Sequence, residues 1–349
     1  MQDQLAWVVA AWAILLACFR YRAQTLMLFT RDIHSAYRSL SLRAHESFAL
    51  RFVRNLMHDH ARLGTAQLRA APQWAAFLVR LACRFRSLGL PSLERVTIAG
   101  VPCDIIRRSG DHRTPLALHD RVIVYLHGGG FITGDTLQYI VPINEILTQA
   151  DRVHSTSVAF VAVDYALSPE HRVPVAVEQV VSVCRALDLP PSKLIIAGDS
   201  AGGNLAIGAC LLLRDVAVAG LVLISPVVLC TPDFADDASV QANDGRDWLP
   251  KTYLTRAIAS YDTGDASTRH LVSPLRYADV SRLPRTLTIA GADEILLDQI
   301  VAFHKRCPAG TLRVGRGVSH IYPLVPNLFD QREASDAYDV ICTWIAGQG

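Results

Sequence analysis

A serine with a glycine two positions away on each side is the residue best suited to do chemistry in this chain. The segment reads Gly198-Asp199-Ser200-Ala201-Gly202. An apolar run precedes it and a helix-forming stretch follows it, so the sequence predicts a strand, a sharp turn and a helix. Such a turn strains the serine backbone, and the flanking glycines avoid side-chain clashes. The pattern therefore predicts a nucleophile exposed above a sheet, beside the N-terminus of a helix.

A serine hydroxyl is a poor nucleophile at neutral pH and needs a base. His320 lies between a last strand-like run, residues 311–314, and a C-terminal helical stretch. We expect it to take the Ser200 proton and return it to the leaving group. Two neighbouring carboxylates, Asp293 and Glu294, precede it in the chain. Either could orient His320 and stabilise its imidazolium.

A glycine-rich loop lies upstream, where the apolar run 122–126 leads into His127-Gly128-Gly129-Gly130-Phe131. Successive glycines after a strand let backbone N–H groups turn toward one point, as an oxyanion hole needs. A phosphate-binding loop is the alternative interpretation. The chain contains no G-x-G-x-x-G or Walker pattern, which disfavours that alternative.

These motifs need a sheet to position them, and eight apolar runs supply its strands. Helical stretches at residues 174–187, 201–213, 297–307 and 334–345 separate or follow the later runs. Alternation of strands and helices predicts a mostly parallel sheet covered by helices on both faces. The predicted strands are 96–98, 104–107, 122–126, 158–163, 194–197, 220–224, 286–290 and 311–314.

Together these residues resemble the hormone-sensitive-lipase-like branch of the α/β-hydrolases. The resemblance rests on the loop 127–131, on Asp164-Tyr165-Ala166-Leu167-Ser168-Pro169-Glu170-His171 and on residues 198–204, and it covers roughly residues 95–345. The order serine, acid, histidine is the order of that fold. The resemblance implies an α/β-hydrolase fold with an eight-stranded sheet and a helical cap. The catalytic domain would span residues 95–349, with a cap insertion at about 227–282.

The resemblance also bears on individual residues. Alignment without gaps from Leu283-Pro284 favours Glu294 as the acid, with Asp293 as the rival. The N–H groups of Gly129, Gly130 and Ala201 are the expected oxyanion donors.

In the same family pattern, His127 would orient the glycine loop, with Gly128, and would not act as a base. Asp164 and Glu170 would be structural, and Asp199 would support the nucleophile. The chain has Ile321 after the histidine, where many relatives have glycine.

The first ninety residues carry little of this resemblance. Residues 5–19 are an unbroken apolar run, followed by Arg20 and Arg22. A helix of that length spans about 22 Å, against roughly 30 Å of bilayer hydrocarbon. A membrane anchor within residues 1–30, similar to those of fungal membrane-associated acetyl-ester hydrolases, and a buried or oligomer-forming cap helix both remain open.

If the apolar run inserts into a membrane, for example that of the endoplasmic reticulum, the arginines after it would keep the rest of the chain on the cytosolic side. If it does not insert, we expect a cytoplasmic protein. No Lys or Arg precedes the run, so we expect no cleaved signal peptide. Residues 31–94 are expected to form cap helices, with apolar stripes over 48–57 and 74–88 and Pro72 near the start of the second. The oligomeric state stays open.

The composition of the chain indicates which kinds of partner and cofactor to expect. The net charge of +2 and the lack of a nucleic-acid motif argue against a nucleic-acid partner. The eight cysteines are scattered, which predicts buried free thiols at Cys18, Cys184, Cys210 and Cys342. His58-Asp59-His60 is expected at a helix surface, so we expect no metal and no cofactor.

The favoured hypothesis is a serine carboxylester hydrolase that acts on short-chain acyl esters of an apolar small molecule through an acyl-enzyme. Acyl transfer, lactonisation or product release in secondary metabolism would use the same intermediate. A catalytically inactive ligand receptor is the third hypothesis. Gibberellin receptors, which are members of this family, lack the catalytic histidine, whereas His320 is present here.

Overall fold

The computed structural model describes residue 54 and residues 64–83, 90–326, 329 and 331–347. The apolar run 5–19, Cys18, His58-Asp59-His60 and nearly all of the predicted cap stripe 48–57 lie outside the described residues. Among the residues that are described, no helix is both long enough and apolar enough to cross a membrane.

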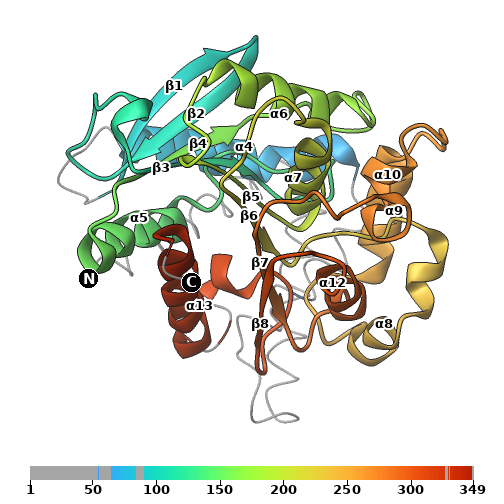
Figure 1. Cartoon of the computed structure of the whole chain (residues 1–349). Helices are drawn as coiled ribbons and strands as arrows, with labels where there is room; N and C mark the ends of the chain where they lie inside the picture. The colour runs from blue at the N-terminus through green and yellow to red at the C-terminus, as the bar shows by residue number, and fades with distance from the viewer. Residues whose placement is uncertain (1–53, 55–63, 84–89, 327–328, 330, 348–349) are drawn as a thin grey trace.

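An eight-stranded sheet forms the centre of the molecule, in the order β1-β2-β4-β3-β5-β6-β7-β8 (Figure 1). Strands β1 and β2 form an antiparallel pair, β2 pairs antiparallel to β4, and all other pairs are parallel. Each strand coincides with one of the eight predicted runs. The strands are β1 (Ser92–Ile98), β2 (Val101–Arg107), β3 (Arg121–Leu126), β4 (Val158–Val163), β5 (Leu194–Asp199), β6 (Gly220–Ile224), β7 (Thr286–Gly291) and β8 (Gly310–Gly315).

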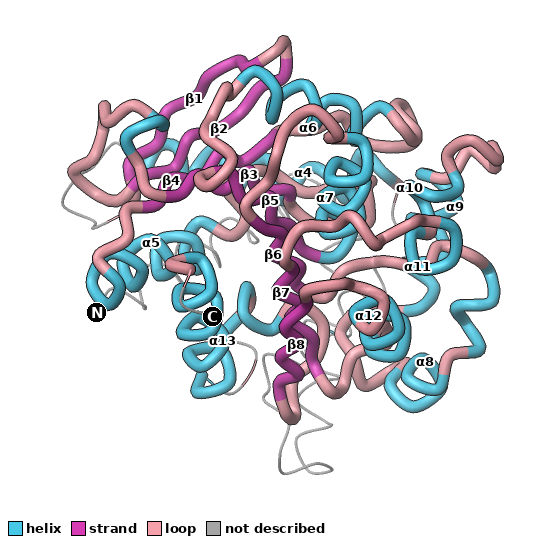
Figure 2. The backbone as a smooth tube through the Cα atoms, in the orientation of Figure 1, coloured by secondary structure: helices cyan, strands magenta, loops and turns pink. Residues whose placement is uncertain are grey.

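Helices cover both faces of this sheet (Figures 1 and 2). One face carries α5 (Ile140–His154) and α13 (Gln331–Ile345), and the other carries α6 (Val175–Ala186), α7 (Ser200–Leu212) and α12 (Leu297–His304). Every residue of β4, β5, β6 and β7 is buried, as expected for parallel strands between two helical layers. The predicted α/β-hydrolase architecture is therefore confirmed.

Several short helices occupy the chain between β6 and β7. The predicted helix near residues 249–260 is α9 (Lys251–Tyr261). The other elements here were not predicted, because segments of three to six residues are too short to show a period. They are η3 (Pro232–Asp236), α8 (Ala238–Asn243), α10 (Arg269–Val272) and α11 (Pro274–Tyr277), and the 3-10 turns elsewhere are η2 (Leu116–Leu118) and η4 (Tyr322–Leu324).

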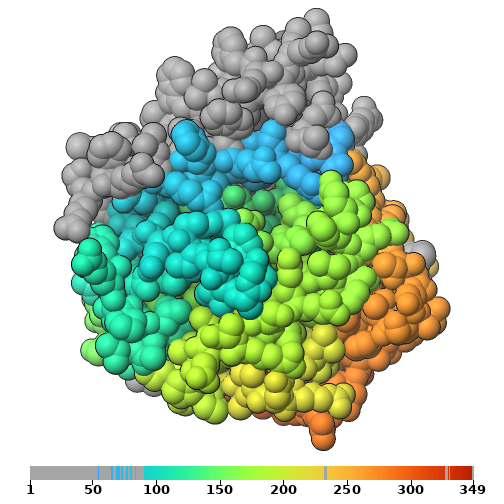
Figure 3. Space-filling view, turned by 90° about the horizontal axis from the view of Figure 1, so that it is seen from above, coloured from blue at the N-terminus to red at the C-terminus, as the bar shows by residue number. Residues whose placement is uncertain are grey.

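Helix α4 (Thr65–Ala82), at the surface in Figure 3, corrects one expectation. The sequence places a helix start near Pro72, but Pro72 lies inside α4. Proline has no N–H for the carbonyl four residues before it, here that of Leu68. The hydroxyl of Thr133 donates to that carbonyl at 2.9 Å, so the helix continues through the proline.

Arg69 ties α4 to the loop that follows the glycine-rich segment. Its guanidinium donates to the carbonyl oxygens of Ile132 at 2.8 Å and Ser168 at 2.6 Å. It also forms a two-point ion pair with Glu170, at 3.0 and 2.7 Å. Glu170 thus has a structural contact in the fold, as the resemblance implied.

The cysteines of the described part of the chain are free. Cys184 and Cys342 are buried as predicted, whereas Cys210 is only partly buried. Burial raises the pKa of the Cys342 thiol to about 12, so it stays protonated and unreactive at neutral pH.

Candidate active site

Ser200 lies at the turn from β5 into α7, with a φ of 51°. That conformation is uncommon for any residue with a side chain and is found where a turn is strained. The flanking glycines permit close contact between backbones. A Cβ at Gly202 would lie 2.0 Å from the carbonyl oxygen of Leu126, and one at Gly198 would lie 2.4 Å from that of Gly202. The turn therefore requires glycine on both sides of the serine.

Three loops at the carboxyl ends of parallel strands bring a serine, a histidine and a carboxylate into one chain of contacts. His320 Nε2 lies 3.0 Å from Ser200 Oγ, and His320 Nδ1 lies 3.2 Å from Glu294 Oε2. All three side chains are buried. With its proton on Nδ1 and facing Glu294, the imidazole leaves Nε2 free to accept the serine proton.

Of the two carboxylates that the sequence left open, Glu294 is the one within hydrogen-bond distance of the His320 imidazole. The N–H of Gly291 donates to Glu294 Oε1 at 3.2 Å and helps to orient the carboxylate. Asp293 instead lies 4.0 Å from the guanidinium of Arg246, with its side chain 35% exposed. The two neighbouring carboxylates thus differ in burial and in partner.

Burial sets the protonation of this pair. Desolvation lowers the pKa of His320 from its ordinary 6.5, opposed by the negative charges of Asp247 and Asp199. Desolvation raises the pKa of Glu294, opposed by hydrogen bonds from Ser225 and Gly291. His320 is therefore neutral at pH 7, the form that a general base requires.

We expect kcat/KM to rise with pH through an inflection below 6.5, because only neutral His320 accepts the serine proton. The folded protein binds this proton less well than the unfolded chain does. His320 therefore costs stability as the pH falls below about 6.5. Initial rates with p-nitrophenyl acetate, read between about pH 4.5 and 8, check the inflection. An inflection above 6.5 would contradict the assignment.

The glycine-rich loop is anchored beside the serine by Asp199. Asp199 Oδ1 accepts hydrogen bonds from the N–H of Gly128 at 2.9 Å and from the Tyr125 hydroxyl at 2.7 Å. Gly129 and Gly130 adopt φ values of 121° and 62°, which favour glycine.

In the part of the chain that the structure describes, the N–H groups of Gly129, Gly130 and Ala201 donate no hydrogen bond to another residue. They are thus unpaired beside the nucleophile.

His127 is buried and packs flat against Tyr165, with ring centroids 4.4 Å apart. The Nδ1 atom of His127 lies 2.8 Å from the carbonyl oxygen of Gly128, and the Tyr165 hydroxyl donates to the carbonyl oxygen of His127 at 2.6 Å. Desolvation lowers the pKa of His127. These contacts hold the start of the glycine loop, consistent with the orienting role expected from the resemblance.

Two residues that the sequence analysis did not single out contact the histidine from the segment between β6 and β7. The indole N–H of Trp248 donates to the carbonyl oxygen of His320 at 2.8 Å. The backbone N–H of His320 donates to the carboxylate of Asp247 at 3.4 Å. An isolated Asp-Trp pair in a polar stretch has no motif that would have marked it.

The residue after the histidine, Ile321, has a φ of 50°, the region that favours glycine. Its N–H donates to the hydroxyl of Ser225 at 2.9 Å, which holds the strained turn in place. The departure from the family's glycine thus keeps the glycine-like backbone conformation.

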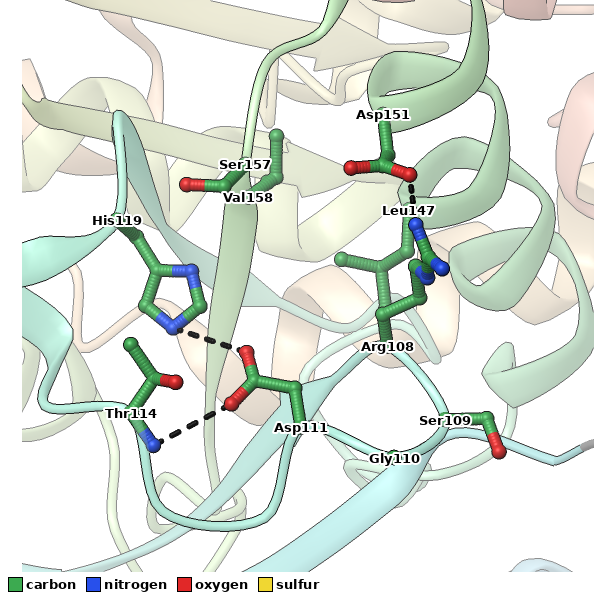
Figure 4. Close-up of a pocket in the computed structure, with 10 residues that line it drawn as sticks. All are labelled: Arg108, Ser109, Gly110, Asp111, Thr114, His119, Leu147, Asp151, Ser157 and Val158. Carbon is green, nitrogen blue, oxygen red and sulfur yellow. Dashed lines mark hydrogen bonds and ion pairs between the residues drawn. The ribbon is translucent and has the colours of Figure 1, made fainter.

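Two described cavities lie at the opposite edge of the sheet, where parallel strands begin. One, of about 410 Å³, adjoins the starts of β3 and β4, and Figure 4 shows His119 facing Asp111 and Arg108 facing Asp151 in it. The other, of about 960 Å³, adjoins the C-terminus of α7 and the chain before β6 and β7. Neither contains Ser200. Among the described residues no cluster of side chains is suited to hold a metal ion.

Comparisons with known proteins agree with this fold. A family model described as alpha/beta hydrolase fold matches residues 123–322. An esterase of Acinetobacter venetianus is 29% identical over 258 residues, covering 71% of this chain and 80% of the relative. An acetyl-hydrolase of Streptomyces hygroscopicus is 30% identical over 234 residues, covering 65% of this chain and 73% of the relative.

Among solved structures, an esterase of the bacterial hormone-sensitive lipase family superposes with a TM-score of 0.70 at 28% identity, covering 87% of this chain and 99% of that one. The chain therefore belongs to the α/β-hydrolase fold family. Within that family it is a serine carboxylic ester hydrolase of the hormone-sensitive-lipase-like branch.

Proposed function

We propose that this enzyme hydrolyses short-chain acyl esters, acetyl esters above all, of an apolar small molecule through an acyl-enzyme on Ser200. The observation that carries the proposal is the contact chain from Ser200 Oγ to His320 Nε2, at 3.0 Å, and from His320 Nδ1 to Glu294 Oε2, at 3.2 Å. A histidine within hydrogen-bond distance of the serine also argues against an inactive receptor.

The proposed reaction has two matching halves. His320 takes the Ser200 proton as Oγ attacks the ester carbonyl carbon, and the carbonyl oxygen becomes an oxyanion. His320 then gives the proton to the departing alcohol as the C–O bond breaks and leaves Ser200 acylated. A water attacks next, its proton passes through His320 to Ser200, and the carboxylic acid leaves.

The unpaired N–H groups of Gly129, Gly130 and Ala201 are the proposed donors to the oxyanion. In acyl transfer, one such donor is worth about 3 kcal/mol of transition-state stabilisation. Glu294 would stabilise the imidazolium that forms at each step.

Aromatic packing over the glycine loop supports a small acyl group. The hydroxyl of Tyr253 in α9 donates to the carbonyl oxygen of Gly129 at 3.1 Å. Phe131 and Tyr261 stack with ring centroids 3.8 Å apart. A Cβ at Gly130 would lie 3.0 Å from the Tyr253 ring, so this ring lies against the glycine loop. The Streptomyces relative is named an acetyl-hydrolase.

The remaining assignments belong to the same proposal. Residues 1–30 would contain the apolar helix that can anchor the enzyme to a membrane, and residues 31–94 would form cap helices. Residues 95–349 would be the catalytic domain, with a cap insertion at about 227–282. A membrane-proximal site would suit an apolar alcohol such as a sterol or a secondary metabolite.

A chain-length series of p-nitrophenyl esters tests the acyl preference, with Ser200→Ala giving the background rate. We expect kcat/KM to be highest for acetate or butyrate and to fall at least about tenfold by octanoate, because the proposed acyl site admits only a short chain. Undiminished activity on the octanoate ester would refute the short-chain preference but not ester hydrolysis itself.

A further inference from the structure

The first half of the segment between β6 and β7 is hydrogen-bonded to the backbones of the acid and base loops. The amide of Asn243 donates to the carbonyl oxygen of Glu294 at 3.1 Å. The hydroxyl of Ser239 donates to that of Ile295 at 2.9 Å. With Trp248 on His320, this segment contacts the backbone at both partners of the nucleophile.

The side chain of Asp247, in this segment, contacts both loops at once. It is fully buried. Its Oδ2 accepts from the N–H of Ile295, next to the acid, at 2.9 Å. Its Oδ1 accepts from the N–H of His320 at 3.4 Å and of Leu249 at 3.2 Å. A single carboxylate thus joins the loop after β7 to the loop after β8.

The same carboxylate adds charge near the base. Three acidic groups from three elements influence His320: Glu294 after β7, Asp199 after β5 and Asp247 from the segment between β6 and β7. The negative charge of Asp247 raises the pKa of His320 against the effect of its burial. Burial raises the pKa of Asp247 to about 6, and the charge of His320 opposes that rise.

We propose that Asp247 is a positioning residue for ester hydrolysis, which holds the acid and base loops together and stabilises the imidazolium form of His320. The proposal rests on the assignment of His320 as the base in the proposed function. It follows from geometry that the reaction needs: His320 must face Ser200 on one side and Glu294 on the other, and the loops that carry His320 and Glu294 hydrogen-bond the same buried carboxylate.

The test is Asp247→Asn, which keeps the side-chain shape and removes the charge. We expect the acidic inflection of kcat/KM to move down by roughly half a pH unit, because the imidazolium loses an attractive charge. We expect kcat for p-nitrophenyl acetate to fall about tenfold with KM within about twofold, since the lost stabilisation acts on the transition state. Rates are expressed per chain that a fluorophosphonate can label, so that any unfolded fraction drops out.

Two further variants make the result specific. Asp244→Asn makes the same chemical change at an exposed position three residues earlier, where the carboxylate accepts from the N–H of Lys251 at 3.3 Å. It should leave the inflection in place. Asp247→Glu retains a negative charge, so its inflection should stay near that of the wild type even if kcat falls.

An unshifted inflection in Asp247→Asn would overturn the proposal, and so would an equal shift in Asp247→Glu. A purely structural role would lower the yield of labelled protein without moving the inflection. Failure of the proposed function can be told apart from failure of this proposal about Asp247, because in the former case the wild-type enzyme itself would not react with the fluorophosphonate.

Discussion

Glutamine in place of Glu294 should lower kcat for p-nitrophenyl acetate by about 10⁴-fold, the effect of the corresponding amide substitution in serine proteases. The amide removes the charge that stabilises the imidazolium, and its NH₂ group can turn toward His320 Nδ1 and favour the unproductive tautomer. Asn in place of Asp293 should keep kcat within about twofold, because exposed pairs such as Asp293 with Arg246 contribute little.

Asp293→Asn is the control for Glu294→Gln, since both variants exchange a carboxylate for an amide at adjacent positions. Thermal unfolding of both proteins establishes that each is folded when assayed. Full activity in Glu294→Gln together with loss in Asp293→Asn would assign the acid to the wrong residue.

Alanine at Gly202 should damage both the fold and the reaction. The added Cβ would lie 2.0 Å from the carbonyl oxygen of Leu126 and 2.6 Å from that of His127, and backbone at these points cannot move without displacing β3 or α7. We expect a loss of at least about 3 kcal/mol in the free energy of unfolding, the upper range for overpacking. Activity of the remaining folded protein should fall about 100-fold, because Ser200 and the glycine loop shift relative to each other.

Gly208→Ala is the matched control in the same helix. Its Cβ would meet the side-chain methyls of Val177 at 3.3 Å, atoms that can shift by a few tenths of an ångström. Alanine also favours a helix over glycine by about 1 kcal/mol, so little net change is expected. Denaturant unfolding measures both variants, and equal losses of stability would contradict the close-contact argument at Gly202.

The inner strands β4 to β7 could be predicted because strands in the middle of a parallel sheet are buried on both faces and stand out as apolar runs. Helix α5 was not predicted, since Pro142 lies in its first turn and a proline in a sequence more often marks a loop or a helix boundary. The true start of α4 depends on the hydroxyl of Thr133, which replaces the N–H that Pro72 lacks. No local pattern contains that contact.

The site divides in the same way. Ser200 and the loop after β3 have local motifs, because a strained turn and converging N–H groups need particular residues at fixed spacing. His320 could be predicted from its position between the last strand and the C-terminal helix. The choice between Asp293 and Glu294 depends on which way adjacent side chains face after β7, which sequence order leaves open. Asp247 contacts His320 across 73 positions of the chain, and nothing near Asp247 in the sequence indicates that contact.

The most direct test is mass spectrometry of the folded wild-type protein after reaction with a fluorophosphonate, which forms a stable adduct with an activated serine. We expect a single adduct, on Ser200, that is absent in Ser200→Ala and forms far more slowly in His320→Ala. An unlabelled wild-type chain, or an adduct on another serine, would contradict the assignment of Ser200 as a nucleophile activated by His320 and Glu294.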